Sequence, residues 1–168
     1  MKPELQTLLL LLINRASEKK LHLQGKLALA LLFSSRRFMV LFERRLADLV
    51  AFRRTSTGMR VVCGEHDTTV RTVARNVRRD FANGCNSLVI LVQQETQRAA
   101  IRRLISREFS DRIQHRTGII TYEDCDRQLK KLSIDFESLA GAVETHQGAN
   151  QNKLFNQTFN PIFYGKKH

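Results

Sequence analysis

The sequence predicts an α/β fold with one mixed sheet, and two patterns carry this prediction. Three short apolar runs follow one another at 38–42, 49–52 and 59–63, with a turn-like TSTG segment between the last two. Runs this close together are typical of an antiparallel meander. Helical and strand-like segments then alternate, which indicates βαβ crossovers with helices on both faces of the sheet.

The N-terminal part is expected to be helical. Pro3 and Glu4 begin a helical pattern, because proline and an acidic residue suit the first turn of a helix. The polar segment 17–25 interrupts that pattern. Residues 26–33 are rich in Ala and Leu and favour a second helix. The SSRR segment at 34–37 then connects this helix to the meander.

The helix after the meander has clear signals at both ends. Thr68 or Thr69 is expected to cap its start, and Asn83-Gly84 is expected to end it. The apolar SLVILVQ run that follows indicates a strand buried on both faces. The remaining expected segments are, in order, this strand at 87–93, a helix at 95–109, a last central strand at 117–122 and a helix at 123–132.

Composition divides the chain into three parts. We assign 1–35 to an N-terminal helical segment, 36–139 to an α/β core and 140–168 to a C-terminal arm. The arm is rich in Asn, Gln, Gly and Thr, so it cannot form a core of its own. Aromatic side chains nevertheless recur along it, and we expect it to dock on a protein partner or a second copy of the chain. They are Phe155, Phe159, Phe163 and Tyr164.

Charge indicates the kind of partner. The 168 residues include 28 Lys plus Arg against 16 Asp plus Glu, a net charge of +12. Such a surplus attracts polyanions through counterion release, so we expect a nucleic acid. The apolar run at 8–13 is far too short to span a bilayer, which excludes membrane insertion through this segment. Three scattered cysteines without metal-ligand spacing favour reduced thiols in a cytoplasmic protein.

Two acidic residues stand at the ends of predicted neighbouring strands. Asp48 precedes the second apolar run and Glu65 closes the third. Carboxylates at the ends of adjacent strands can share a divalent cation such as Mg²⁺. In a strongly basic chain this arrangement indicates a phosphodiester-cleaving site. Arginines near the acids are the expected phosphate contacts: Arg53, Arg54, Arg71, Arg75, Arg78 and Arg79.

The order of elements, with LADLV at 46–50 and VVCGEHD at 61–67, resembles the core of the PD-(D/E)XK nuclease superfamily. The resemblance covers 38–122 and implies a restriction-endonuclease-like core. That family has an acid at the start of its second strand and a Glu-x-Lys in its third, and Asp48 and Glu65 match the two acids. The resemblance implies that they hold Mg²⁺ or Mn²⁺ and that the substrate is DNA rather than RNA.

The chain departs from that pattern where the family has its lysine, because Asp67 stands there. Asp67 could act as a third catalytic carboxylate, with Arg71 or Arg75 of the next helix supplying the positive charge. His66 should face the other side of the sheet, because side chains alternate along a strand. The departure leaves open an alternative: a non-catalytic nucleic-acid-binding or assembly subunit with a degenerate nuclease fold.

Overall fold

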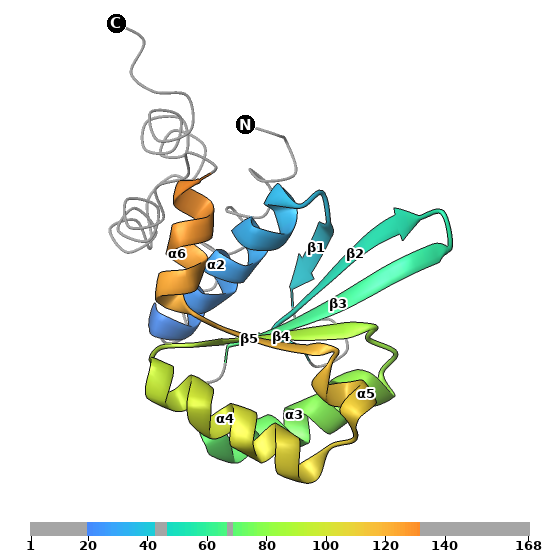
Figure 1. Cartoon of the computed structure of the whole chain (residues 1–168). Helices are drawn as coiled ribbons and strands as arrows, with labels where there is room; N and C mark the ends of the chain where they lie inside the picture. Colours follow the sequence, from blue (N-terminus) through green and yellow to red (C-terminus); the bar gives the residue numbers. More distant parts are fainter. Residues whose placement is uncertain (1–19, 43–46, 67–68, 132–168) are drawn as a thin grey trace, which may run out of the picture.

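The computed structural model contains one five-stranded mixed sheet between two layers of helices (Figure 1). It describes residues 20–42, 47–66 and 69–131. The strands are β1 (Met39–Phe42), β2 (Leu49–Thr55), β3 (Gly58–His66), β4 (Ser87–Val92) and β5 (Thr117–Thr121). The helices are α2 (Lys20–Ser35), α3 (Val70–Ala82), α4 (Glu95–Glu108), α5 (Asp111–Gln114) and α6 (Tyr122–Lys130). The predicted α/β fold is confirmed.

The strands lie in chain order, β1-β2-β3-β4-β5. Antiparallel pairs join β1, β2 and β3, and parallel pairs join β3, β4 and β5. The three apolar runs are therefore consecutive strands of one sheet, as the sequence predicts. One expectation is wrong: β5 is an edge strand rather than a central one, because no further described strand follows it in the chain to pair with its outer side.

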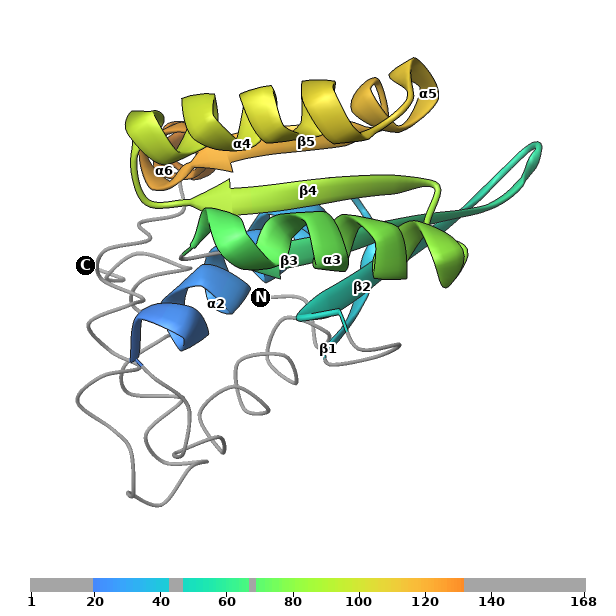
Figure 2. The same cartoon turned by 90° about the horizontal axis from the view of Figure 1, so that it is seen from below.

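The β2–β3 hairpin extends beyond the apolar runs that predict it. Its last register pair joins Thr55 to Gly58, and Gly58 has a φ of 127°, a conformation that side chains disfavour. Beyond the apolar runs, residues 53–55 and 58–60 continue the two strands as a two-stranded arm. This arm projects past the rest of the sheet in Figures 1 and 2. Arg53 and Arg60 lie in this arm as a cross-strand pair.

Helices cover both faces of the sheet, with α2 and α6 on one and α3 and α4 on the other (Figures 1 and 2). Two separate clusters of buried side chains follow from this arrangement. Alternation along β3 decides which cluster each residue joins, so Val62 packs towards α2 while Cys63 packs towards α3. The middle of the sheet is therefore buried on both sides, as its apolar strands require, while Met39 and Leu41 of β1 and Met59 of β3 remain exposed.

Helix α2 begins earlier than expected. The polar composition of 17–25 predicts a break, yet the helix already runs from Lys20 and includes Gly25. Glycine is required at that position, because a Cβ on Gly25 would lie 2.4 Å from Cγ of His66 and would displace the ring. The short α5 has no counterpart in the sequence expectations. The N-terminal helical pattern from Pro3 and the arm at 140–168 lie outside the described residues.

The structure corrects the expectation of reduced thiols at two cysteines. Cys63 of β3 and Cys85, just before β4, form a disulfide with a Cα–Cα distance of 6.0 Å. The turn of chain through α3 brings them together under that helix, although 22 positions separate them. Cys125 is buried as a free thiol. None of the described helices has the length and hydropathy needed to cross a membrane.

Candidate active site

Asp48 and Glu65 meet where β2 begins and β3 ends. The register pair Leu49–Gly64 places the two acids in neighbouring positions. The backbone N–H of Asp48 donates to Oε1 of Glu65 at 3.2 Å, and the backbone N–H of His66 donates to Oδ2 of Asp48 at 2.8 Å. The structure therefore places the two residues side by side, and the bonds that join this part of the site run through backbone N–H groups rather than between the two carboxylates.

Glu65 faces α3 and has a cation as its partner. The side chain is only 5% exposed, and its Oε1 lies 2.6 Å from Nη2 of Arg79. Nδ2 of Asn76 donates to Oε2 at 3.2 Å. A buried carboxylate needs such partners, because an isolated charge in the interior is strongly disfavoured. Helix α3 therefore presents Asn76 and Arg79, one turn apart, to hold the Glu65 side chain in position.

Asp80 is a third carboxylate beside this pair, and the sequence expectations did not include it. Its side chain is fully buried, and its Oδ1 accepts from Nε of Arg79 at 2.9 Å. Burial raises the pKa of Asp80, although hydrogen bonds with Arg79 and Glu65 oppose the rise. Arg79 thus bridges two acids. The pattern that could have revealed this role is the Asn76 to Asp80 spacing, which places both residues on one helix face.

Asp48 faces α2, where two basic side chains lie beside it. Nε2 of His22 is 3.1 Å from Oδ1 of Asp48, and Nζ of Lys26 is 3.9 Å from the same oxygen. Burial alone would raise the pKa of Asp48, but hydrogen bonds from His22 and the His66 backbone, with the charge of Lys26, hold it below its usual value. The carboxylate is therefore ionised at neutral pH.

Lys26 is the unexpected cation of the site. Lys26 is only 2% exposed, although lysine is almost never fully buried without a partner. In the sequence it is a single charge at the start of an Ala/Leu-rich helical segment, and His22 lies four positions earlier on the same face. That spacing is the signal that could have indicated a paired function.

His66 points towards α2, opposite to Glu65, as strand alternation predicts. Its ring joins Tyr122 and His22: Nε2 is 3.3 Å from the Tyr122 hydroxyl, and Nδ1 is 3.3 Å from Nδ1 of His22. One assignment of protons satisfies every contact with both rings neutral. In it Tyr122 donates to His66, His66 donates to His22, and His22 donates to Asp48. A hydrogen-bonded chain thus leads from Tyr122 to the carboxylate.

Burial has opposite effects on the pKa values of two members of this chain, His66 and Tyr122. Burial, with the charge of Lys26 and that of His22 when protonated, lowers the pKa of His66 from 6.5 to about 4, while Asp48 opposes this change. Burial also raises the pKa of Tyr122. At neutral pH the imidazole is therefore uncharged and the phenol keeps its proton, which is the protonation that the chain requires.

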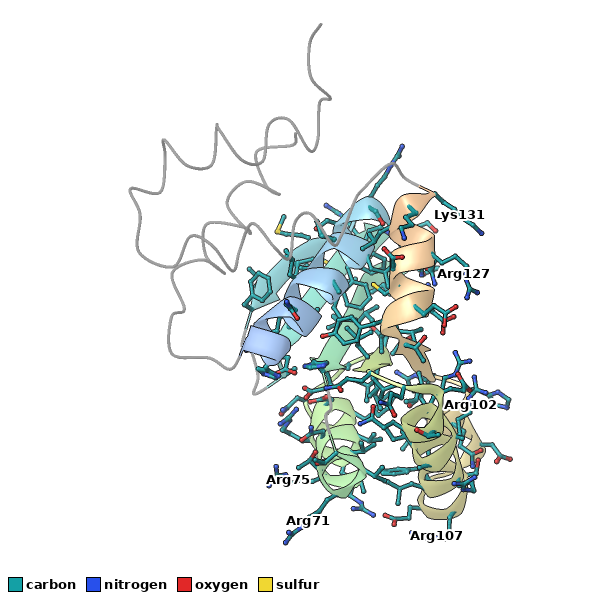
Figure 3. All side chains as sticks on the ribbon, turned by 90° about the vertical axis from the view of Figure 1, so that its left-hand side faces the viewer. Arg71, Arg75, Arg102, Arg107, Arg127 and Lys131 are labelled. Atoms are coloured by element: carbon teal, nitrogen blue, oxygen red, sulfur yellow. A yellow bond between two sulfur atoms is a disulfide. The ribbon has the colours of Figure 1, made fainter. Side chains whose placement is uncertain are left out.

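The expected basic partners lie elsewhere than predicted. Arg79, rather than Arg71 or Arg75, contacts Glu65. Arg71 and Arg75 are exposed on α3 and point away from the protein (Figure 3). Arg54 is exposed on the arm, and Arg78 pairs with Glu108 at 2.9 Å. Asp67 falls outside the described residues, so its predicted part in the site stays a prediction.

The two carboxylates suit a small divalent cation. Within the described residues there is no group of three or more His, Cys, Asp or Glu side chains arranged as metal ligands. Mg²⁺, however, takes one or two carboxylates and keeps several waters. Asp48 and Glu65 carry such oxygens, but the Asp48 carboxylate contacts His22 and Lys26 of α2, and the Glu65 carboxylate contacts Arg79 and Asn76 of α3. A shared ion would therefore have to replace some of these partners.

Comparisons of the chain with family models, with curated proteins and with solved structures find no match. Function is therefore inferred from the geometry of the carboxylate site and from the distribution of charge over the protein.

Proposed function

We propose that this protein is a metal-dependent nucleic-acid phosphodiester hydrolase of the restriction-endonuclease-like kind, with DNA as its substrate. The adjacency of Asp48 and Glu65, where β2 begins and β3 ends, is the observation that carries the proposal. The order of the first four strands and the net charge of +12 support it. The activity would place the protein in a DNA-processing or defence system.

The residues around the acids have distinct tasks in this proposal. Lys26 and His22 keep Asp48 ionised, and Arg79 and Asn76 hold Glu65 in position. Bound Mg²⁺ or Mn²⁺ would lower the pKa of a water and offset charge at the phosphorus. Asp67 stands where the nuclease family has a lysine, so that position carries no positive charge. Lys26 brings a positive charge to the site from α2 instead.

One observation favours a second candidate, a non-catalytic nucleic-acid-binding or assembly subunit. Both carboxylates already accept hydrogen bonds from protein groups: Asp48 from His22 and the His66 backbone, and Glu65 from Arg79 and Asn76. A site satisfied in this way can persist as structure after cleavage has been lost. Docking of 140–168 on a partner or second copy is a further proposal that follows from the sequence. A cytoplasmic location is also a proposal, but the Cys63–Cys85 disulfide removes the argument from reduced thiols.

Cleavage assays separate the two candidates. The natural protein should degrade plasmid DNA with Mg²⁺ or Mn²⁺ and stop when EDTA is added. We expect Glu65→Gln to reduce the rate at least 100-fold, the scale of losing one group that stabilises charge in a transition state. Lys26→Met should reduce it about tenfold and move the acidic limb of the pH–rate profile upwards, because the pKa of Asp48 rises without the lysine.

The matched control is Arg102→Gln, which removes an exposed positive charge from α4 (Figure 3). It should leave the shape of the pH–rate profile unchanged. Binding of DNA without metal-dependent cleavage in any variant would favour the non-catalytic subunit. Equal degradation by the natural protein and Glu65→Gln would indicate a contaminating nuclease and would contradict the assigned site.

The exposed arginines of α3 are the proposed phosphate contacts. Arg71→Gln/Arg75→Gln should weaken binding to all DNA sequences and reduce the slope of log affinity against log salt by about 1 for each phosphate that is no longer neutralised. Fluorescence anisotropy over a salt series measures both quantities. The control is Arg127→Gln/Lys131→Gln, on the opposite side of the sheet, which should change neither (Figure 3). Equal effects of the two pairs would mean that net charge alone attracts the nucleic acid.

A further inference from the structure

A hollow lies away from the carboxylate site, between the C-terminal end of α2 and the start of the β2–β3 arm. Its volume is about 620 Å³, within the range of small-molecule sites. Four arginines line it, and its other lining side chains are apolar or are serines. No carboxylate of the described residues takes part in the lining. The charged lining side chains are Arg36, Arg37, Arg53 and Arg60.

Two of these arginines lie directly opposite each other. Arg53 of β2 and Arg60 of β3 are register partners on one face of the antiparallel pair. Like charges in that arrangement repel and disfavour the hairpin. Arg53 is held in place, because its Nη1 donates to the carbonyl of Arg36 at 3.1 Å and its guanidinium lies 4.8 Å from the centre of the Phe38 ring. An anion between the two strands would remove the repulsion.

Arg37 adds a second observation, because its backbone is in an unfavourable conformation. Its φ is 62°, and it is the only non-glycine residue with positive φ in the described part of the chain. The N–H groups of Arg37 and Phe38 bond back to the carbonyls of Ser34 and Phe33, at 3.0 and 3.1 Å. This is a helix ending in which glycine usually takes the left-handed position. An arginine at this position makes the helix ending less stable than a glycine would, and it places a guanidinium at the hollow.

From these observations we propose that this hollow, the arginine pocket, binds a nucleotide through its phosphate. Guanidinium groups match phosphate oxygens with paired hydrogen bonds, so the arginine rim suits a phosphate better than a smaller halide. The side chains of Arg37 and Arg60 have no hydrogen-bond or ion-pair partner among the described residues, and both are exposed. They are therefore available to a ligand.

The apolar part of the pocket selects a nucleotide over a bare phosphate. Phe33, Val62 and Val89 line it together with the arginines. Val62 of β3 and Val89 of β4 lie two register positions apart on adjacent parallel strands and pack in the same cluster, which gives the pocket an apolar side formed by the sheet. A ligand that carries a flat, weakly polar base next to a phosphate matches both halves of this surface.

The arginine pocket is separate from the carboxylate site. Arg53 follows Asp48 by five positions along the β2 direction, a separation of about 17 Å in an extended strand. Nucleotide binding in the pocket thus goes beyond the proposed cleavage and does not require it. A phosphate next to a base occurs in two kinds of ligand: a free nucleotide, and the phosphorylated end of a nucleic-acid strand.

Calorimetric titration of the full chain with adenosine monophosphate tests the proposal. We expect saturable binding that is tighter than for inorganic phosphate or adenosine. Arg37→Gly/Arg60→Gln should weaken it at least tenfold. Because glycine suits the left-handed position, this variant should not have a lower urea midpoint than the natural protein. Loss of binding then cannot be attributed to unfolding. Arg102→Gln/Arg103→Gln, on the outer side of α4, removes the same charge and should leave the affinity unchanged.

Competition identifies the source. Displacement of bound nucleotide by a 5′-phosphorylated oligonucleotide, but not by its 5′-hydroxyl counterpart, would assign the pocket to a strand end; displacement by neither would assign it to a free nucleotide. The proposal is overturned if adenosine monophosphate fails to saturate the natural protein at millimolar concentration. It is also overturned if Arg37→Gly/Arg60→Gln keeps full affinity, or if phosphate or adenosine alone binds as tightly as the nucleotide.

Discussion

Replacing Glu65 with alanine should lower the free energy of unfolding by about 3–5 kcal/mol, the usual result of removing one partner from a buried ion pair. The Glu65 carboxylate is 5% exposed and contacts Arg79 at 2.6 Å. Its removal leaves Arg79 with Asp80 and takes away the acceptor of the Asn76 amide and of the Asp48 N–H. Urea denaturation at pH 7 measures the change.

A surface pair of the same chemistry provides the control. Arg78 and Glu108 are 2.9 Å apart, but the arginine side chain is 60% exposed. Water solvates both charges there, so Glu108→Ala should move the urea midpoint far less than Glu65→Ala. Similar midpoints for the two variants would mean that the Glu65 pair is as well solvated as a surface pair, and would contradict its description as a buried centre.

Acidification should destabilise the protein between pH 6.5 and about 4 because of His66. The folded-state pKa of His66 is lowered from 6.5 to about 4. As the pH falls through this window, His66 becomes protonated in the unfolded chain but stays neutral in the folded chain. The contribution of the neutral His66 ring to the free energy of unfolding is therefore fully present above pH 6.5, and it is lost as the pH falls towards 4. The loss is about 1.4 kcal/mol per pH unit, or about 3 kcal/mol in all.

His66→Gln isolates this contribution, because glutamine does not titrate. We expect the natural protein to lose stability steeply over the window and the variant to lose less, by the amount assigned to His66. Urea midpoints from pH 7.5 to pH 4 give both curves. Asp48, His22, Lys26 and Tyr122 surround the ring, and their effects are shared by the two proteins. Parallel curves would show that His66 titrates normally.

The strands could be predicted from sequence because each contains a short, largely apolar run. Residues 38–42, 49–52 and 59–63 are recognisable by composition alone, and they correspond to β1, β2 and β3. Burial of both faces requires such runs, so the local pattern carries the information. Helix α3 could also be predicted from local signals: its apolar residues recur at helical spacing, and Thr69 marks its start.

The cationic half of the site was beyond sequence reasoning. Lys26 and His22 are 22 or more positions from the acid they contact, and nothing local indicates which strand end lies beside them. Arg79 is one of several arginines of α3, and only its rotation about the helix axis distinguishes it from Arg75. Helix α2 likewise passes through a polar segment in which Gly25 packs on His66, a contact between distant parts of the chain.

The sequence by itself determined the α/β class, the three-strand meander, the basic character and the two acids Asp48 and Glu65, because each depends on residues close together in the chain or on composition. Only the tertiary structure decided that Lys26, His22 and Arg79 are the partners of those acids, that Cys63 pairs with Cys85, and that four arginines form a pocket. Ion pairs, disulfides and pockets join atoms brought together by sheet register and helix packing, which no local pattern specifies.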